Sequence, residues 1–151
     1  MGELARHWVR ASQPIELAKA IGYSRQAGDA ALRALAPADA LGHYTQALDL
    51  LGQLDTPDPV LGIDLAIGLG TAQRQAGVPE YRDTLLEAGA KAEDAGDTRR
   101  LVAAALANHR GWVSAVGVLD ADKVEMLETA LDRLAADSPG RALVLAPCAR
   151  S

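Results

Sequence analysis

The chain has 151 residues, a length that fits a single domain with a modest core. Its formal net charge is −5, and acidic and basic residues alternate without forming a basic block, which argues against a nucleic-acid-binding groove. Hydrophobic residues make up 49% of the chain but aromatic residues only 3%, so its apolar surface comes from small aliphatic side chains. Ala and Leu favour helices, and small side chains allow helices to approach closely.

Cysteine content and hydropathy bear on the cellular compartment. The single cysteine, Cys148, cannot form an internal disulfide, and the first residues lack the basic and apolar regions of a signal peptide. No uncharged apolar run reaches the roughly 18 residues that a membrane-spanning helix needs. We therefore expect a cytoplasmic chain that does not insert into a membrane, and no redox role for Cys148.

Pro, Gly and Asp divide the chain into segments of helical length. Pro favours the first turn of a helix and Asp or Ser its N-cap, so these residues predict helix starts. Within the segments apolar residues recur at helical spacing, and no alternating β pattern competes, so the sequence predicts an all-α fold. In chain order, the expected helices cover residues 3–11, 14–35, 37–54, 59–76, 79–95, 97–116, 120 or 122 to 136, and a last one from 138.

A pattern of small residues recurs along these helices. Gly28, Gly70 and Gly111 lie 42 and 41 residues apart, compared with about 34 in a tetratricopeptide repeat. A Gly where two helices cross lets the backbones approach, and a larger residue opposite fills the space beside it. The expected repeat-packing positions are Gly28, Ala40, Tyr44, Ala47, Gly70, Leu86, Gly111, Leu127 and Ala130.

This recurrence predicts a right-handed array of antiparallel helix pairs with about three degenerate, tetratricopeptide-like repeats in one domain. Because no further repeat covers Leu143, Val144 and Leu145, we expect uncovered terminal helices, with self-association or instability of the chain as the consequence. The expected parts are a leading helix at 1–12, helix-pair units at about 15–54, 59–95 and 97–136, and a truncated last helix at 138–151.

Several short motifs carry a family resemblance. They are residues 3–8 (ELARHW), 27–32 (AGDAAL), 36–41 (APADAL), 44–51 (YTQALDLL) and 108–114 (NHRGWVS). Together they resemble the helical-repeat region of large bacterial signal-transduction ATPases, chiefly actinobacterial. Those proteins end in a LuxR-type helix-turn-helix or carry an adenylate-cyclase-like domain. The chain lacks the phosphate loop of their ATPase module, so we expect a fragment of such a regulator, with neither ATPase nor DNA-binding activity of its own.

The resemblance implies a noncatalytic interaction or sensor module of a transcriptional regulator or signal-transduction ATPase. Its partner would be a protein, a peptide or another domain of the same regulator, with no direct contact to nucleic acid or membrane. The alternative is a regulatory remnant of an ATPase or adenylate-cyclase enzyme that lacks its catalytic portion. We expect no enzyme active site, cofactor or metal in this chain.

Two motifs that resemble ligand-binding sequences have structural explanations. Gly68 and Gly70 begin like a dinucleotide fingerprint, but they lie within a helical stripe rather than after a strand, which favours helix contacts. Asp120 and Asp122 suggest a calcium loop, but the other positions of that loop do not fit. Asp122 and Glu125 instead have the spacing of a capping box at a helix start.

The candidate nucleophile and metal ligands are isolated. His7, His43 and His109 fall in separate helices without metal-ligand spacing, and Ser114 lacks the flanking glycines of a nucleophile elbow. A Trp and an Arg beside a close helix contact can still line a binding surface. Helix packing is the favoured explanation of this stretch, and its alternative is an interaction surface made of Arg110, Trp112 and Ser114, next to Gly111.

Overall fold

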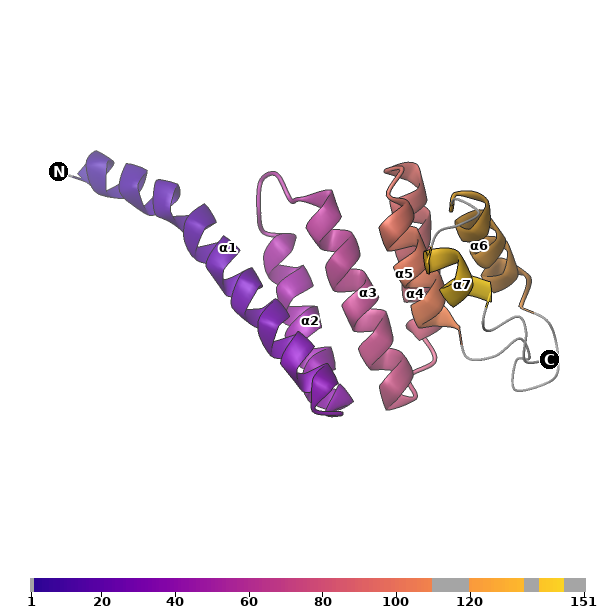
Figure 1. Ribbon diagram of the computed structural model, residues 1–151. Coiled ribbons are helices and arrows are strands. Elements are labelled where there is room, and N and C mark those ends of the chain that lie inside the picture. The colour runs from indigo at the N-terminus through magenta and orange to yellow at the C-terminus, as the bar shows by residue number, and fades with distance from the viewer. Residues whose placement is uncertain (1, 110–119, 135–138, 146–151) are drawn as a thin grey trace.

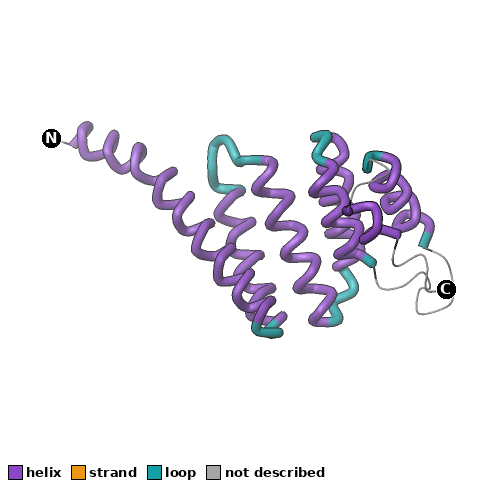
Figure 2. The backbone as a smooth tube through the Cα atoms, in the orientation of Figure 1, coloured by secondary structure: helices purple, strands orange, loops and turns teal. Residues whose placement is uncertain are grey.

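The computed structural model describes residues 2–109, 120–134 and 139–145, and every regular element in these ranges is an α-helix (Figure 1). This confirms the all-α fold. Short loops connect most of the helices, as Figure 2 shows. The helices are α1 (Gly2–Arg33), α2 (Pro37–Leu51), α3 (Pro59–Ala76), α4 (Tyr81–Asp94), α5 (Thr98–Asn108), α6 (Ala121–Asp132) and α7 (Pro139–Leu145).

Two predicted helix boundaries were wrong. The separate leading helix does not exist, because α1 runs through Pro14 as one helix of 32 residues. The fixed φ of Pro is itself helical, so a helix can continue through it at the loss of one backbone hydrogen bond. Helix α5 ends at Asn108, where His109 turns to an extended conformation, rather than continuing to residue 116. Figure 1 shows the N-terminal part of α1 extending beyond the other helices.

Aspartate caps start three of the helices, as their sequence positions predicted. The carboxylates of Asp58 and Asp97 accept hydrogen bonds from backbone N–H groups in the first turns of α3 and α5, at 2.9 and 3.0 Å. Asp120 caps α6 in the same way, so the cap lies at Asp120 and not at Asp122 as the capping-box spacing predicted. These side chains satisfy backbone donors that have no partner within the helix.

Left-handed residues end three of the helices. Gly77 (φ 76°) follows α3 and Gly96 (φ 67°) follows α4, and each helix end has the two backbone hydrogen bonds of a Schellman motif. Leu35 (φ 54°) takes the same place after α1, with the same pair of hydrogen bonds. A side chain in this conformation is strained, so α1 ends at a cost that the two glycines avoid.

The helices pack in chain order as a row, with α3 shared between two cores. The N-terminal core joins α1, α2 and α3 through Ile21, Ala40, Tyr44, Ala47, Leu51, Leu65 and Ala72. The C-terminal core joins α3 to α7 through Ile63, Ala88, Ala92, Leu101, Ala104, Ala105, Met126, Leu127, Ala130 and Val144. Because α3 presents Leu65 and Ala72 to one side and Ile63 to the other, it couples the two halves of the row.

The Tyr44 side chain of α2 fills the space where α1, α2 and α3 approach each other closely. Its ring lies against the backbone of Gly28 on α1 and of Gly68 on α3. The hydroxyl donates a hydrogen bond of 2.6 Å to the Asp29 carboxylate. Burial, followed by this bond to a carboxylate, raises the pKa of the Tyr44 phenol. Tyr44 therefore fixes the spacing of three helices at once.

The other expected repeat-packing positions lie in the cores or beside them. Gly70 contacts Leu85, whereas Leu86, its expected partner one residue later, is partly buried and packs against the C-terminal core. Gly89 faces the Met126 sulfur across the α4–α6 contact. Ala40 and Ala47 are fully buried in the N-terminal core, and Leu127 and Ala130 are buried in the C-terminal core.

The last described helix is partly covered. Val144, expected to be exposed, is fully buried in the C-terminal core, where α7 contacts α5 and α6. The α7 side chain of Arg141 donates to the Leu131 carbonyl at the end of α6 at 2.8 Å. Leu145 is 42% exposed, and the Leu143 side chain lies outside the described residues. Of the described helices, none is long and apolar enough to cross a membrane.

Candidate functional site

A groove runs over α3 between α2 and α4. Both helices pack against α3, but they make no contact with each other, so one face of α3 lies open between them. The open space has a volume of about 970 Å³. We call it the α3 groove.

The floor of the α3 groove is apolar. It includes an i, i+3 row of α3 residues, Val60, Ile63, Ala66 and Leu69, which winds around the helix. Leu48 and Leu51 of α2 and Ala88 of α4 extend this surface at its sides. Val60, at the start of α3, is 38% exposed.

The rim of the α3 groove is acidic. Glu80, Asp83, Glu87 and Asp94 form a stripe that begins at the N-cap of α4 and continues along the helix. Asp58, the N-cap of α3, adds a fifth carboxylate. Among the described residues that line the groove, Lys91 alone is cationic. Its ammonium lies 2.7 Å from the Glu87 carboxylate, one turn away on the same helix. The groove thus combines an apolar floor with a negatively charged wall.

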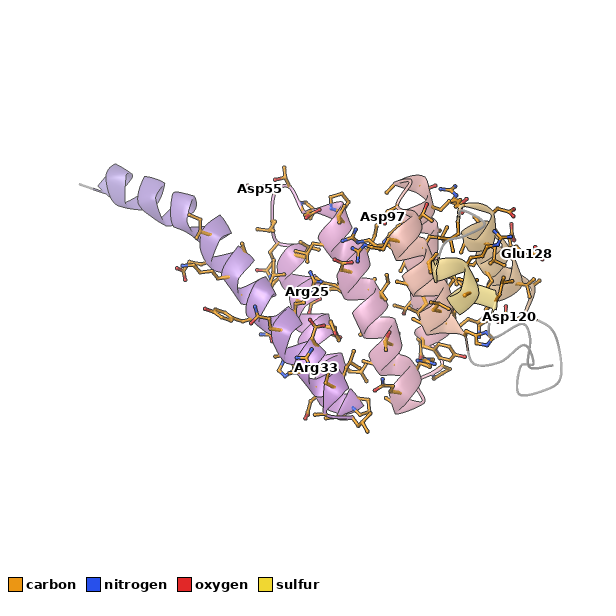
Figure 3. The ribbon with its side chains drawn as sticks, in the orientation of Figure 1. Arg25, Arg33, Asp55, Asp97, Asp120 and Glu128 are labelled. Carbon is orange, nitrogen blue, oxygen red and sulfur yellow. The ribbon has the colours of Figure 1, made fainter. Side chains whose placement is uncertain are left out.

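A partly buried ion-pair cluster holds the helices next to the groove. Arg100 of α5 donates two parallel hydrogen bonds to the Asp64 carboxylate of α3, at 2.7 and 2.9 Å, and also contacts Asp97. Arg25 of α1 approaches the same Asp64 carboxylate at 3.4 Å, so the cluster links α1, α3 and α5. Figure 3 labels Arg25 and Asp97 on either side of α3. Hydrogen bonds from Arg100 lower the pKa of Asp97.

A second cluster joins α4 to the start of α6. Arg82 donates two hydrogen bonds of 2.8 Å to the Asp120 carboxylate, and it also contacts Asp122. The side chain of Asp120 is only 18% exposed. The Arg82 guanidinium lowers the pKa of Asp120 to about 2, so this carboxylate stays ionised through mildly acidic conditions. Lys123 lies over the Tyr81 ring, 5.0 Å from its centre, and completes the contact.

The interaction surface expected from the sequence, Arg110, Trp112 and Ser114 beside Gly111, lies outside the described residues. Two residues of the same motif, Asn108 and His109, are described. Asn108 is buried at the end of α5 and donates to the Arg82 carbonyl at 3.4 Å.

The described residues contain no cluster of three or more His, Cys, Asp or Glu side chains that could hold a metal ion. His43 belongs to α2 and His109 follows α5, and these two helices do not touch. Gly68 and Gly70 both serve as close helix contacts, with Tyr44 and Leu85 respectively.

The sequence contains a signal for the groove that is separate from the repeat pattern. The acidic residues of α4 follow helical spacing on a helix whose other face carries Leu85 and Ala92. A stripe of four carboxylates next to a buried face marks an exposed charged wall. The acidic stripe does not by itself predict the apolar surface of α3 beside it.

Comparisons with known proteins give no match: no protein-family model, no curated protein and no solved structure is similar to the chain.

Proposed function

We propose that the chain is a noncatalytic protein-interaction module that binds a peptide or helix of a partner protein in the α3 groove. The observation that carries this proposal is the open apolar floor of α3 between α2 and α4. Ligand-binding clefts in proteins have volumes of roughly 300–1,000 Å³. A groove of about 970 Å³ with an apolar floor suits the apolar face of a helix or an extended peptide.

We further propose that the helices form antiparallel pairs in a right-handed, tetratricopeptide-like array. Three ion pairs support a repeating unit, because they join residues 36, 38 and 40 positions apart, close to one predicted repeat. These pairs are Asp64 with Arg100, Arg82 with Asp120, and Glu93 with Arg133. In such an array each unit stacks on the next and leaves long surfaces for binding.

The biological setting we propose rests on the sequence motifs alone. In the helical-repeat region of a signal-transduction ATPase, the module would bind another domain of the same regulator or a separate protein. The groove supplies a place for either contact, since both would present a helix or a peptide segment.

The experiment is a selection of displayed random peptides on the purified chain, followed by affinity measurements on two variants. Val60→Asp replaces an exposed apolar residue of the groove, and an acidic residue in the first turn of α3 suits the helix dipole. Tyr23→Asp is the matched control, because Tyr23 is 70% exposed on α1 outside the groove.

We expect the selected peptides to bind Val60→Asp at least about tenfold more weakly than the unmodified chain, since a buried Val contact is worth about 1.5 kcal/mol or more. Their affinity for Tyr23→Asp should not change. A selection that enriches no peptide, or peptides that bind both variants equally well, would contradict the proposal.

A further inference from the structure

The charges of the α3 groove specify its occupant more narrowly than its apolar floor does. Its lining holds five carboxylates and one ammonium group, which gives it a net charge of −4. The whole chain has a net charge of −5, with 15 basic and 20 acidic residues. Most of the net negative charge of the chain therefore falls on the residues that line the groove.

The protein itself neutralises only part of this charge. Lys91 pairs with Glu87, and Arg82 lies 3.0 Å from Asp83, whose side chain is 81% exposed. Within the described ranges no cation pairs with the carboxylates of Glu80 and Asp94. Exposed pairs such as Lys91 with Glu87 contribute little and remain available to a competing cation.

The carboxylates also lie where a bound helix would place its flanks. The α4 stripe borders the apolar floor along a helix of 14 residues, and Asp58 lies at one end of the floor, before the first turn of α3. A helix laid on the floor would have its apolar face against Ala66 and Leu69. Its Lys or Arg side chains would extend along the floor, with their charged ends at the rim.

We infer that the α3 groove receives a basic amphipathic helix of a partner protein, with its apolar face on α3 and its cationic side chains against the carboxylates of α4 and Asp58. This inference rests on the proposed function and adds the chemistry of the partner. An acidic helix of the same apolar face is repelled by the rim, so the charges select between partners as well as attract one.

The test uses two fluorescently labelled helical peptides of about 14 residues. Both carry Leu at the spacing i, i+3, i+4 and i+7, and the remaining positions are Lys in one peptide and Glu in the other. Their affinities for the full chain are measured by fluorescence anisotropy at low and at physiological salt. We expect the Lys peptide to bind on the order of tenfold more tightly than the Glu peptide, and this preference to shrink as salt rises.

Two triple variants show whether the rim of the groove causes the preference for the Lys peptide. The rim variant combines Asp58→Asn, Glu87→Gln and Asp94→Asn, and the Asp58→Asn change keeps the N-cap of α3 because Asn caps a helix as well as Asp does. The control variant removes the same charge from exposed residues outside the groove, through Asp39→Asn, Glu125→Gln and Glu128→Gln. We expect the rim variant to lose most of the preference for the Lys peptide and the control variant to keep it.

The outcomes separate the inference from the function on which it rests. Equal loss of preference in both triple variants would overturn the inference, because total charge and not the rim would then select the peptide. If the two peptides bind equally and Val60→Asp weakens both, the groove binds apolar helices and the inference on charge is overturned. If Val60→Asp weakens neither peptide, the proposed function is overturned with it.

Discussion

Adding one methyl group at Gly68 should destabilise the protein far more than adding it at Gly42, although both glycines lie inside helices. A Cβ atom on Gly68 would lie 2.4 Å from Tyr44 Cε1 and 2.5 Å from Cζ, well inside the van der Waals distance. The Tyr44 ring cannot withdraw, because on its other side a Cβ at Gly28 would already lie only 3.0 Å from the ring. A Cβ on Gly42 meets no atom within 4 Å.

The magnitudes follow from opposing effects. Gly to Ala inside a helix stabilises it by about 1 kcal/mol, and overpacking a core costs about 1–3 kcal/mol or more. Gly42→Ala should therefore raise the free energy of unfolding by about 0.5–1 kcal/mol. Gly68→Ala should lower it by about 1–3 kcal/mol, because the rigid ring is held on both sides and the clash is severe.

The assay is urea unfolding followed by circular dichroism for both variants and the unmodified chain. Replacing Tyr44 by Leu in the Gly68→Ala background should recover part of the loss, since the two sites are in direct contact and their effects are not additive. Equal stability of Gly68→Ala and Gly42→Ala would refute the contact between Tyr44 and α3 on which the N-terminal core depends.

Three further predictions concern helix ends and pH. Leu35→Gly should raise the free energy of unfolding by about 0.5–1 kcal/mol by relieving the left-handed residue, whereas Gly77→Ala should lower it by about 1 kcal/mol, both measured by urea unfolding. Asp120→Asn keeps an N-cap but loses the ion pair with Arg82, so it should cost roughly 1–2 kcal/mol at pH 6. Because the pKa of Asp120 falls to about 2 on folding, its contribution is complete above about pH 4 and disappears toward pH 2, and urea unfolding at pH 6 and pH 3 should show the gap to Asp120→Asn narrowing.

Most helix starts could be predicted from the sequence because they depend on local chemistry. Pro37 and Pro59 begin α2 and α3, and Asp97 caps α5, as their residue types require. The helix boundary expected at Pro14 was wrong. Pro has the same φ value at a helix start and within a helix, so its residue type does not distinguish the two positions.

Contacts between helices were harder to predict than the helices themselves. The match of Gly28 with Tyr44 is a real contact, but the same offset from Gly70 points to Leu86 and the contact is with Leu85. One fixed offset therefore does not describe both contacts. Gly68 of α3 contacts Tyr44 of α2, and the spacing between α3 and α4 does not predict this contact.

The α3 groove depends on an arrangement that no local pattern contains. Each of its apolar residues on α3 looks like a core position in the sequence, because the spacing of Val60, Ile63 and Ala66 is that of a buried stripe. In the structure Ile63 is buried in the C-terminal core, whereas Val60 is exposed beside the space between α2 and α4, which pack on α3 without meeting. The acidic stripe of α4 could be predicted, and its place beside an apolar floor could not.

Chemical-shift mapping of the isotope-labelled chain with a peptide selected on it tests the central proposal most directly. Binding in the α3 groove predicts that the largest shifts of backbone amides fall in the groove-lining parts of α2, α3 and α4, including Leu69 and Thr84. Shifts confined to α1 or α6, or the absence of any saturable shift, would contradict the α3 groove as the site of partner binding.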